Sequence, residues 1–312
     1  MQVLKKYFVS AIALLAVACG EASIPSTPVL HEGEGLLELP LVATTTAGRS
    51  YKLVGASFAI TGPQSITITD TSADTVSVPL LAGLYTVQMT GSWHVERTDA
   101  PGQTVPATLV SPNPMSFTVG EGQTRPVRFL FKVAGDATAD VGFSVDHGGW
   151  ISGSIEFELM GGPQDPSIFA ALGGTTVPFV ISFASSTVTR LPGPYEKRVE
   201  VVTGPVTLQF GGTASDVLQN RVVPALEGLP LVLRLTRTPF NSEVEIDYIR
   251  LESLETGTQF GLLPEPVDGA GDSEGYPTLQ PFVLDGHFDI MRNGPERSDT
   301  AFGRVHGQIA PQ

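Results

Sequence analysis

Ser273 is the residue of this sequence that comes closest to a known catalytic pattern. It lies in GDSEG at residues 271–275, which satisfies the G-x-S-x-G pattern that presents a nucleophilic serine. Such a serine needs an apolar strand before it and a helix after it, because the sharp turn between them exposes its hydroxyl. Here PEPVDGA precedes the pattern and YPTLQP follows it. The sequence therefore predicts a flexible acidic loop and no nucleophile.

A serine hydrolase also needs a histidine and a carboxylate beside its serine. GDSEG resembles the GDSGG of chymotrypsin-like proteases, which implies a histidine in a TAxHC-like setting. Neither His94, in SWHVE, nor His147, in VDHGG, has that setting. Asp285 or Asp289 followed by His306 gives the order Ser, Asp, His, but these residues follow more closely than in the usual hydrolase domain. We predict no catalytic residue.

His287, Asp289 and His306 are the residues best suited to bind a transition metal. Positions 287 and 289 share one face of a strand if residues 287–291 are extended, so their spacing permits a site. A facial triad also needs a pocket and hydrogen-bonded support around its ligands. We interpret the two histidines as surface residues, or as core residues with backbone partners, and predict neither a metal nor a cofactor.

Two acidic segments have the carboxylate-rich composition that calcium prefers. Within the loop at 265–275, residues 268–274 carry three acids without the EF-hand spacing: Asp268, Asp272 and Glu274. The segment 243–247 carries three at alternating positions: Glu243, Glu245 and Asp247. Calcium takes about six to eight oxygens, and three carboxylates on separated rungs of a strand supply too few. Solvation is the preferred interpretation, and calcium binding at either segment stays open.

The chain has two tryptophans, Trp93 and Trp150, and tryptophan also serves as a platform for sugars. They form no regular array, so we interpret both as core residues. Trp93 is expected to close a first core, and Trp150 lies near a domain junction. The sequence SPNP at residues 111–114 is a turn signal and nothing more.

The elements that would position these residues are almost all strands. From residue 36 onward, apolar residues alternate with Thr, Ser, Gln and Glu over short stretches bounded by Gly and Pro. The clearest alternating runs are 66–69, 85–90, 127–133, 155–159, 206–210 and 231–235. The chief helical candidate is 215–223. Strands that recur every ten to fifteen residues or so predict an all-β fold of sandwich or barrel type.

A small, polar and acidic break, AGDATAD at residues 134–140, divides the strands into two series. We expect a β-sandwich domain at 36–133, a linker at 134–140 and a second β-sandwich domain, jelly-roll-like in one interpretation, at 141–312. The division rests on length as well, because the strand-rich part is longer than a usual single sandwich.

The segment LAGLYTV at residues 81–87 marks a strand of the first domain. Gly83 permits a turn with positive φ, after which Tyr85 and Val87 point inward. The segment resembles the aGxYtv sequence of transthyretin-like and carboxypeptidase-regulatory-like β-sandwiches. The resemblance covers about ten residues of the domain and implies a fold without an activity.

In the second domain, the sequence EVEIDYIRL at residues 243–251 changes its apolar face. Apolar residues occupy positions 244, 246 and 248, and then positions 249 and 251. A bulge, or burial of both faces, would explain the change. The segment is similar to the late strand of jelly-roll carbohydrate-binding modules, where an acidic residue precedes IRL.

Residues 1–18 have the pattern of a cleaved signal peptide. Lys5 and Lys6 form a positively charged start, and residues 7–17 supply an apolar run. That run is too short to span a hydrocarbon core of about 30 Å as a permanent helix. We therefore expect an exported protein.

The sequence AVAC at residues 16–19 resembles the lipobox of bacterial lipoproteins, although Ala16 replaces the favoured leucine. The resemblance implies a lipidated Cys19 at the start of the mature chain. Two or more acyl chains anchor a protein stably where one gives marginal binding. An ordinary secretory signal is the alternative, but Cys19 is the chain's only cysteine, which favours lipidation. The remaining chain then has no thiol for disulfides or thiolate metal sites.

Residues 19–35 are expected to form the lipidated cysteine and a flexible tether rich in Gly, Pro, Ser and Glu. The chain has a formal net charge of −14. Loss of residues 1–18 removes two lysines and no acid, which gives −16. An acidic surface argues against nucleic acid and anionic lipid headgroups as partners. Gly20 replaces the aspartate that retains lipoproteins at the inner membrane in the enterobacterial pattern, so we expect the outer membrane.

The sequence as a whole predicts a lipid-anchored bacterial envelope protein that acts as a non-catalytic binding or structural module. Its partners are the membrane, through the lipid, and an envelope protein or a glycan. The alternative is an envelope hydrolase or carbohydrate-active protein with its site in the second domain. If so, Trp150, His147 and the segment 264–289 would surround one concave pocket.

Overall fold

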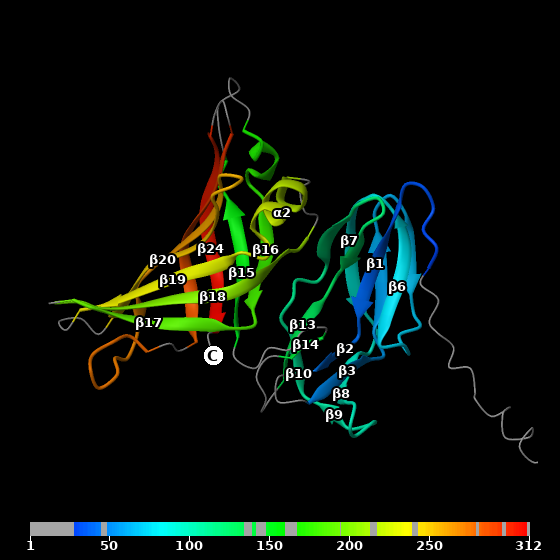
Figure 1. Cartoon of the computed structure of the whole chain (residues 1–312), viewed down its shortest axis with the longest axis horizontal. Helices are drawn as coiled ribbons and strands as arrows, with labels where there is room; N and C mark the ends of the chain where they lie inside the picture. The colour runs from blue at the N-terminus through cyan, green and yellow to red at the C-terminus, as the bar shows by residue number, and fades with distance from the viewer. Residues whose placement is uncertain are drawn as a thin grey trace, which may run out of the picture.

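The computed structural model describes most of the chain beyond residue 27, and Figure 1 shows its trace. The described residues are 28–44, 49–133, 139–141, 148–159, 167–193, 195–212, 217–238, 243–278, 281–294 and 298–310. Their regular structure is almost entirely β-strand, which confirms the all-β fold class. The expected signal peptide, Cys19 and the tether up to residue 27 lie outside the described residues.

The first unit of the structure consists of short strands around one core. Its strands are β1 (Glu34–Pro40), β2 (Val42–Thr44), β3 (Ser50–Val54), β4 (Ser57–Thr61), β5 (Ser65–Ile68), β6 (Thr75–Leu81), β7 (Gly83–Thr90), β8 (His94–Arg97), β9 (Thr104–Val105), β10 (Ala107–Leu109), β11 (Met115–Val119), β12 (Thr124–Pro126), β13 (Phe129–Val133) and β14 (Ala139–Val141). They form small sheets in the orders β12-β1-β6, β11-β7-β4-β5, β2-β3-β8-β9 and β10-β13-β14. Strand β14 begins at residue 139 of the expected linker and pairs with β13.

Tyr85 lies at the centre of the first core. Its buried ring stacks on that of Phe117, with centroids 5.6 Å apart, and its hydroxyl donates to the Leu81 carbonyl at 2.9 Å. Gly83 has a φ of 153°, and Val87 is buried beside Tyr85. The positive φ and the inward side chains expected from LAGLYTV are therefore confirmed.

The second unit has longer strands and three short helices. Its strands are β15 (Gly149–Phe157), β16 (Thr176–Phe183), β17 (Ser186–Pro192), β18 (Lys197–Phe210), β19 (Pro230–Arg237), β20 (Glu243–Ser253), β21 (Thr258–Pro264), β22 (Val267–Asp268), β23 (Phe282–Asn293) and β24 (Ser298–Ala310). Its helices are η1 (Ala170–Leu172), the π-helical turn η2 (Leu218–Val222) and α2 (Val223–Leu226). The turn η2 lies within the predicted helix at 215–223, and α2 begins at the last residue of that range.

Eight of the described strands in the second unit close into one barrel-like sheet. Its order is β16-β15-β24-β23-β21-β20-β19-β18, and β18 pairs back with β16. Each of these pairings is antiparallel. The second unit is thus all-β as expected, but it is a single closed sheet in up-and-down order where we expected a sandwich or jelly roll.

The long strand β18 explains the difference. It has 14 residues and pairs with β17 through Thr203 and with β19 through Pro205, then with β16 from Val206 onward. Its register with β19 shifts between Val202 and Pro205. Alternation in a sequence shows that a strand has one buried face but says nothing about which strands it joins. Figure 1 shows β17 to β20 extending to one side beyond the closed part of the sheet.

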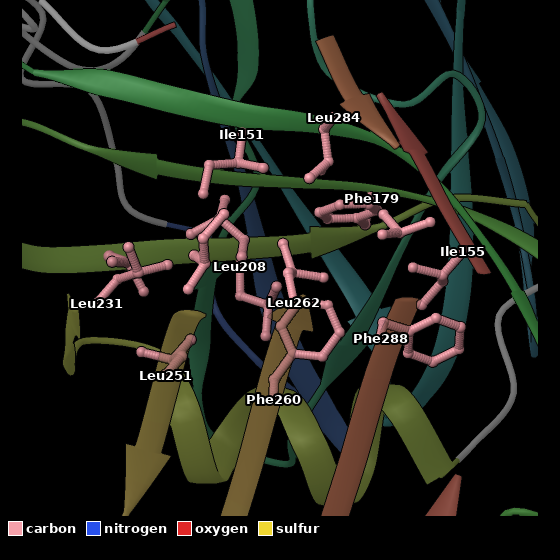
Figure 2. Packing of buried hydrophobic residues seen from close by; sticks show 14 of the residues in the cluster. Ile151, Ile155, Phe179, Leu208, Leu231, Leu251, Phe260, Leu262, Leu284 and Phe288 are labelled. Carbon is pink, nitrogen blue, oxygen red and sulfur yellow. The ribbon is translucent and has the colours of Figure 1, made fainter. Parts of the chain in front are cut away.

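Aromatic side chains fill the closed sheet. Phe260 contacts Phe179 and Phe210 edge-to-face, with ring centroids 5.9 and 6.3 Å away. Phe157 and Phe288 form a second such pair at 5.0 Å. Figure 2 shows Phe179, Phe260 and Phe288 among aliphatic side chains that point into the same interior. This core shares no residue with that of the first unit.

Strand β20 contains a bulge at Asp247. Ile246 is opposite Leu235 and Tyr248 is opposite Arg234, so Asp247 is the extra residue. Asp247 is exposed and Tyr248 is half-buried. The alternating buried residues end at Ile246 before this pair and resume at Ile249 after it. The predicted change of face is therefore confirmed, and a bulge causes it.

The seam between β15 and β24 depends on glycine. Gly153 lies opposite Gly307, and a Cβ atom on either would collide with a backbone oxygen of the facing strand. Gly303 would collide in the same way with the carbonyl of Glu156. The two backbones can approach this closely only without side chains.

We expect Phe260→Ala to destabilise the second unit by about 3 to 5 kcal/mol, because it removes a buried ring and leaves a cavity. Phe302→Ala is the matched control, since Phe302 is 46% exposed, and it should cost less than about 1 kcal/mol. Urea unfolding followed by fluorescence measures both. Equal losses for the two variants would contradict the closed, packed interior.

Candidate functional site

Ser273 lies in an exposed turn with neither a strand next to it nor a helix. The turn is organised by Asp272, whose Oδ1 accepts the N–H groups of Glu274 and Tyr276 at 2.9 and 3.0 Å. This is the acidic loop that the sequence predicts. A nucleophile elbow has a different framework, because its serine joins a strand to a helix.

Arg190 of β17 holds this loop in place. Its Nη2 donates to Asp272 Oδ2 at 2.6 Å, and its guanidinium lies 5.0 Å from the centroid of the Tyr276 ring. Lys197 also lies over that ring, at 5.2 Å. Burial alone would raise the pKa of Asp272, but backbone hydrogen bonds from Tyr276 and Glu274 and the charge of Arg190 outweigh it and lower the pKa.

The histidines considered for catalysis lie apart from Ser273. His306 Nδ1 is 3.1 Å from Asp285 Oδ1, and the two residues are opposite each other on the exposed face of β23 and β24. His94 Nε2 is 2.7 Å from Glu96 Oε1 in the first unit. Neither contact includes Ser273, so the structure does not bring a serine, histidine and carboxylate together at these residues.

Asp289 and His287 share the outer face of β23, as predicted. Asp289 Oδ2 accepts a hydrogen bond from Gln259 Nε2 at 3.1 Å. Burial raises the pKa of Asp289, while the hydrogen bond from Gln259 and the charge of Arg250 oppose the rise. His306 pairs with Asp285 instead of joining these two residues.

The acidic candidates for calcium are spread along strand β20 and the loop at 268–274, and all of them except the half-buried Asp272 are exposed. Residues 243, 245 and 247 all face solvent, and Thr236 Oγ1 donates to Asp247 Oδ2 at 2.9 Å. In the part of the chain that the structure describes, no group of three His, Cys, Asp or Glu side chains is close enough together to hold a metal ion.

The two tryptophans have separate roles in packing. Trp93 packs edge-on against Phe131, with ring centroids 5.1 Å apart, and helps to close the first core as expected. Trp150 is buried on β15 beside a groove of about 290 Å³. No described residue of 264–289 lines that groove. His147 lies outside the described residues.

The sequence analysis missed a polar contact that joins the two units. Residues 111–114, which we expected to form only a turn, face the end of β18. Ser111 Oγ donates to Gln209 Oε1 at 2.9 Å and accepts the Leu130 N–H at 2.8 Å. Gln209 Nε2 donates to the Arg128 carbonyl at 2.8 Å. Both Ser111 and Gln209 are buried, so these hydrogen bonds are shielded from water.

Backbone groups extend this contact. The Gly212 N–H donates to the Pro114 carbonyl at 3.1 Å, and Ser116 Oγ donates to the Gly212 carbonyl at 2.8 Å. Met115 and Gly211 form an isolated antiparallel bridge between the units. The pair Gly211-Gly212 at the end of an apolar strand is the one sequence signal of such a close approach.

A cavity of about 40 Å³ lies beside this contact, between the two units, and we call it the interunit cavity. Its walls include three buried apolar side chains of the first unit: Met115, Phe117 and Val127. Its polar lining includes Arg125 from β12, Gln219 from η2 and Glu227 next to α2. Figure 1 shows α2 on the side of the second unit that faces the first.

The polar side chains of the interunit cavity differ in exposure. Arg125 Nη1 lies 3.2 Å from Glu227 Oε2, and these two side chains are 31% and 30% exposed. Gln219 is only 4% exposed, and its Nε2 has no hydrogen-bond partner among the described residues. The Nε of Arg125 is also buried without one. Buried donors without partners are rare in folded proteins and therefore mark this cavity.

Comparisons with known proteins found no match to the chain. No protein-family model matches it, and neither the curated proteins nor the solved structures contain a significant match. Within the described residues, no helix has the length and apolar character needed to cross a membrane.

Ser111→Ala should lower the free energy of unfolding by about 1 to 3 kcal/mol. The substitution removes the hydroxyl that bonds the Leu130 N–H and the Gln209 side chain, and both groups stay buried without that partner. Ser273→Ala, in the exposed turn, should change it by less than about 0.5 kcal/mol. Chemical denaturation of both variants provides the comparison. If Ser111→Ala is as mild as the control, the interunit contact contributes nothing to stability.

Asp272→Asn should lower the melting temperature near neutral pH, because it removes the ion pair with Arg190. The pKa of Asp272 is lowered from 3.8, so its stabilisation is present above pH 3.8 and is lost as pH falls through the folded-state pKa. The difference from the unmodified protein should therefore shrink in acid. Asp268→Asn, an exposed carboxylate of the same loop, is the control. A difference in melting temperature that grows as the pH falls would contradict the lowered pKa of Asp272.

Proposed function

We propose that this protein is a lipid-anchored bacterial envelope protein that acts as a non-catalytic binding or structural module. In this proposal, the lipid on Cys19 fixes the protein to the outer membrane, and the residues between Cys19 and β1 give it reach. The two all-β units form the body that meets an envelope protein or a glycan.

The observation that carries the proposal is the polar contact between the two units. Buried hydrogen bonds from Ser111 and Gln209 and the bridge at Met115 and Gly211 join them. Two units joined in this way present their loops in a fixed relation to each other. That property suits a module that holds or recognises a partner.

The alternative of a hydrolase or carbohydrate-active protein has less support in the described residues. Ser273 lies in a turn, and His306 pairs with Asp285 on an exposed face. Trp150 is only 7% exposed, so little of its ring is open for stacking on a sugar. These positions are dispersed, which favours the non-catalytic proposal.

The proposal predicts that Cys19→Ser abolishes acylation and releases the protein from membranes into the aqueous phase. Ala16→Leu, which restores the favoured lipobox residue, should remain acylated and is the matched control. Mass spectrometry of protein extracted from native cells, with detergent partitioning, measures both. An unmodified chain that retains its first methionine and carries no acyl mass would overturn the proposed anchor.

A further inference from the structure

The interunit cavity combines hydrogen-bond donors with a short apolar wall. Gln219 Nε2 and Arg125 Nε are buried and have no hydrogen-bond partner among the described residues. Both side chains line the cavity, together with Met115, Phe117 and Val127. A ligand that satisfies these groups must supply acceptor oxygens and a small apolar part.

The charges around the interunit cavity favour an anionic ligand. Arg125 and Arg128 line it from the first unit, and Glu227 is the one acidic side chain in its lining. Glu227 accepts a hydrogen bond from Nη1 of Arg125, which leaves the Nε edge of that guanidinium for another acceptor. This concentration of positive charge stands out in a chain whose formal net charge is −14. A carboxylate is the acceptor that guanidinium geometry suits best.

The volume of the interunit cavity limits the ligand to a small group. By the measure that gives about 40 Å³ here, roughly 10 to 15 Å³ accommodates one water molecule. The cavity therefore has room for about three or four non-hydrogen atoms. A carboxylate with one short apolar substituent fits that room. Anything longer must continue past the partly exposed Arg125 and Glu227 side chains toward solvent.

We propose that the interunit cavity is a binding site for a small monocarboxylate group. Gln219 and Arg125 donate hydrogen bonds to the carboxylate oxygens, and Met115, Phe117 and Val127 contact the short apolar substituent. Because the lining comes from both units, the bound group joins them and stabilises their relative position. This inference deepens the binding half of the proposed function and does not depend on the lipid anchor.

The test is a titration with small acids at neutral pH. The protein is the whole chain from residue 19 onward, with Cys19→Ser to prevent acylation. Acetate is the probe, and acetamide is its neutral counterpart of nearly the same shape. Acetate should shift the side-chain amide signals of Gln219 in nuclear magnetic resonance spectra and raise the melting temperature, while acetamide should do neither. Failure of acetate to shift the Gln219 signals would overturn the site. An equal response to acetamide would overturn the role of charge.

Matched variants locate the effect. Gln219→Leu removes the buried donors and should weaken acetate binding about tenfold or more, since a hydrogen bond to a charged group contributes about 1.5 to 3 kcal/mol. Gln259→Leu, which removes an amide on the outer face of the second unit, should leave acetate binding unchanged. If both variants bind acetate equally, the site is elsewhere. If Gln219→Leu does not fold, the acetate titration of the protein that retains Gln219 still tests the site through the amide signals of that residue.

The source of the carboxylate is decided by a third probe. N-acetylglycine carries the terminal carboxylate of a peptide, so tighter binding than acetate indicates a protein chain end, and weaker binding indicates a free small acid. Both results support a carboxylate site. A negative titration would remove this site and leave the anchor of the proposed function untouched, whereas absence of acyl mass on Cys19 would remove the anchor and leave the site untouched.

Discussion

The hydrogen bonds of one buried serine and one buried glutamine connect the two halves of this protein. Ser111 Oγ bonds at once to Gln209 of the second unit and to the Leu130 N–H of the first. Gln209 returns a hydrogen bond to the Arg128 carbonyl. The two hydrogen bonds of Gln209 form only when the units are together, and an unpartnered buried polar group is costly. The interunit cavity lies beside this contact and is lined by residues of both units.

The same strand closes the second unit and presents the glutamine. In β18, Leu208 and Phe210 point into the closed sheet and are buried in its core, while Gln209 between them points outward to the first unit. Strand alternation makes this double role possible, since successive side chains face opposite sides. Correct closure against β16 and correct docking of the first unit therefore depend on one register. A slip by one residue would exchange the two faces.

The sequence shows local features of this structure and hides the long-range ones. Alternation located strands such as β7, β13 and β19, because burial of one face leaves a direct trace in residue order. The change of apolar face in β20 was visible for the same reason, and the structure attributes it to the bulge at Asp247. Closure of the second unit into one sheet was not visible, because pairing between β15 and β24 or β16 and β18 leaves no periodic signal. The interunit site was missed because Ser111 and Gln219 look like ordinary polar residues until their burial is known.

The glycine seam between β15 and β24 has a consequence for the order in which the molecule assembles. Strand β15 ends at Phe157 and its partner β24 begins at Ser298, so a ribosome completes the first long before the second exists. Until then, β15 carries a free edge on which Gly153 has no side chain to repel a neighbour. Such edges invite pairing with other chains. During synthesis, the nascent second unit is therefore an open sheet that needs shielding, and it acquires its protected form only when its final strand is delivered.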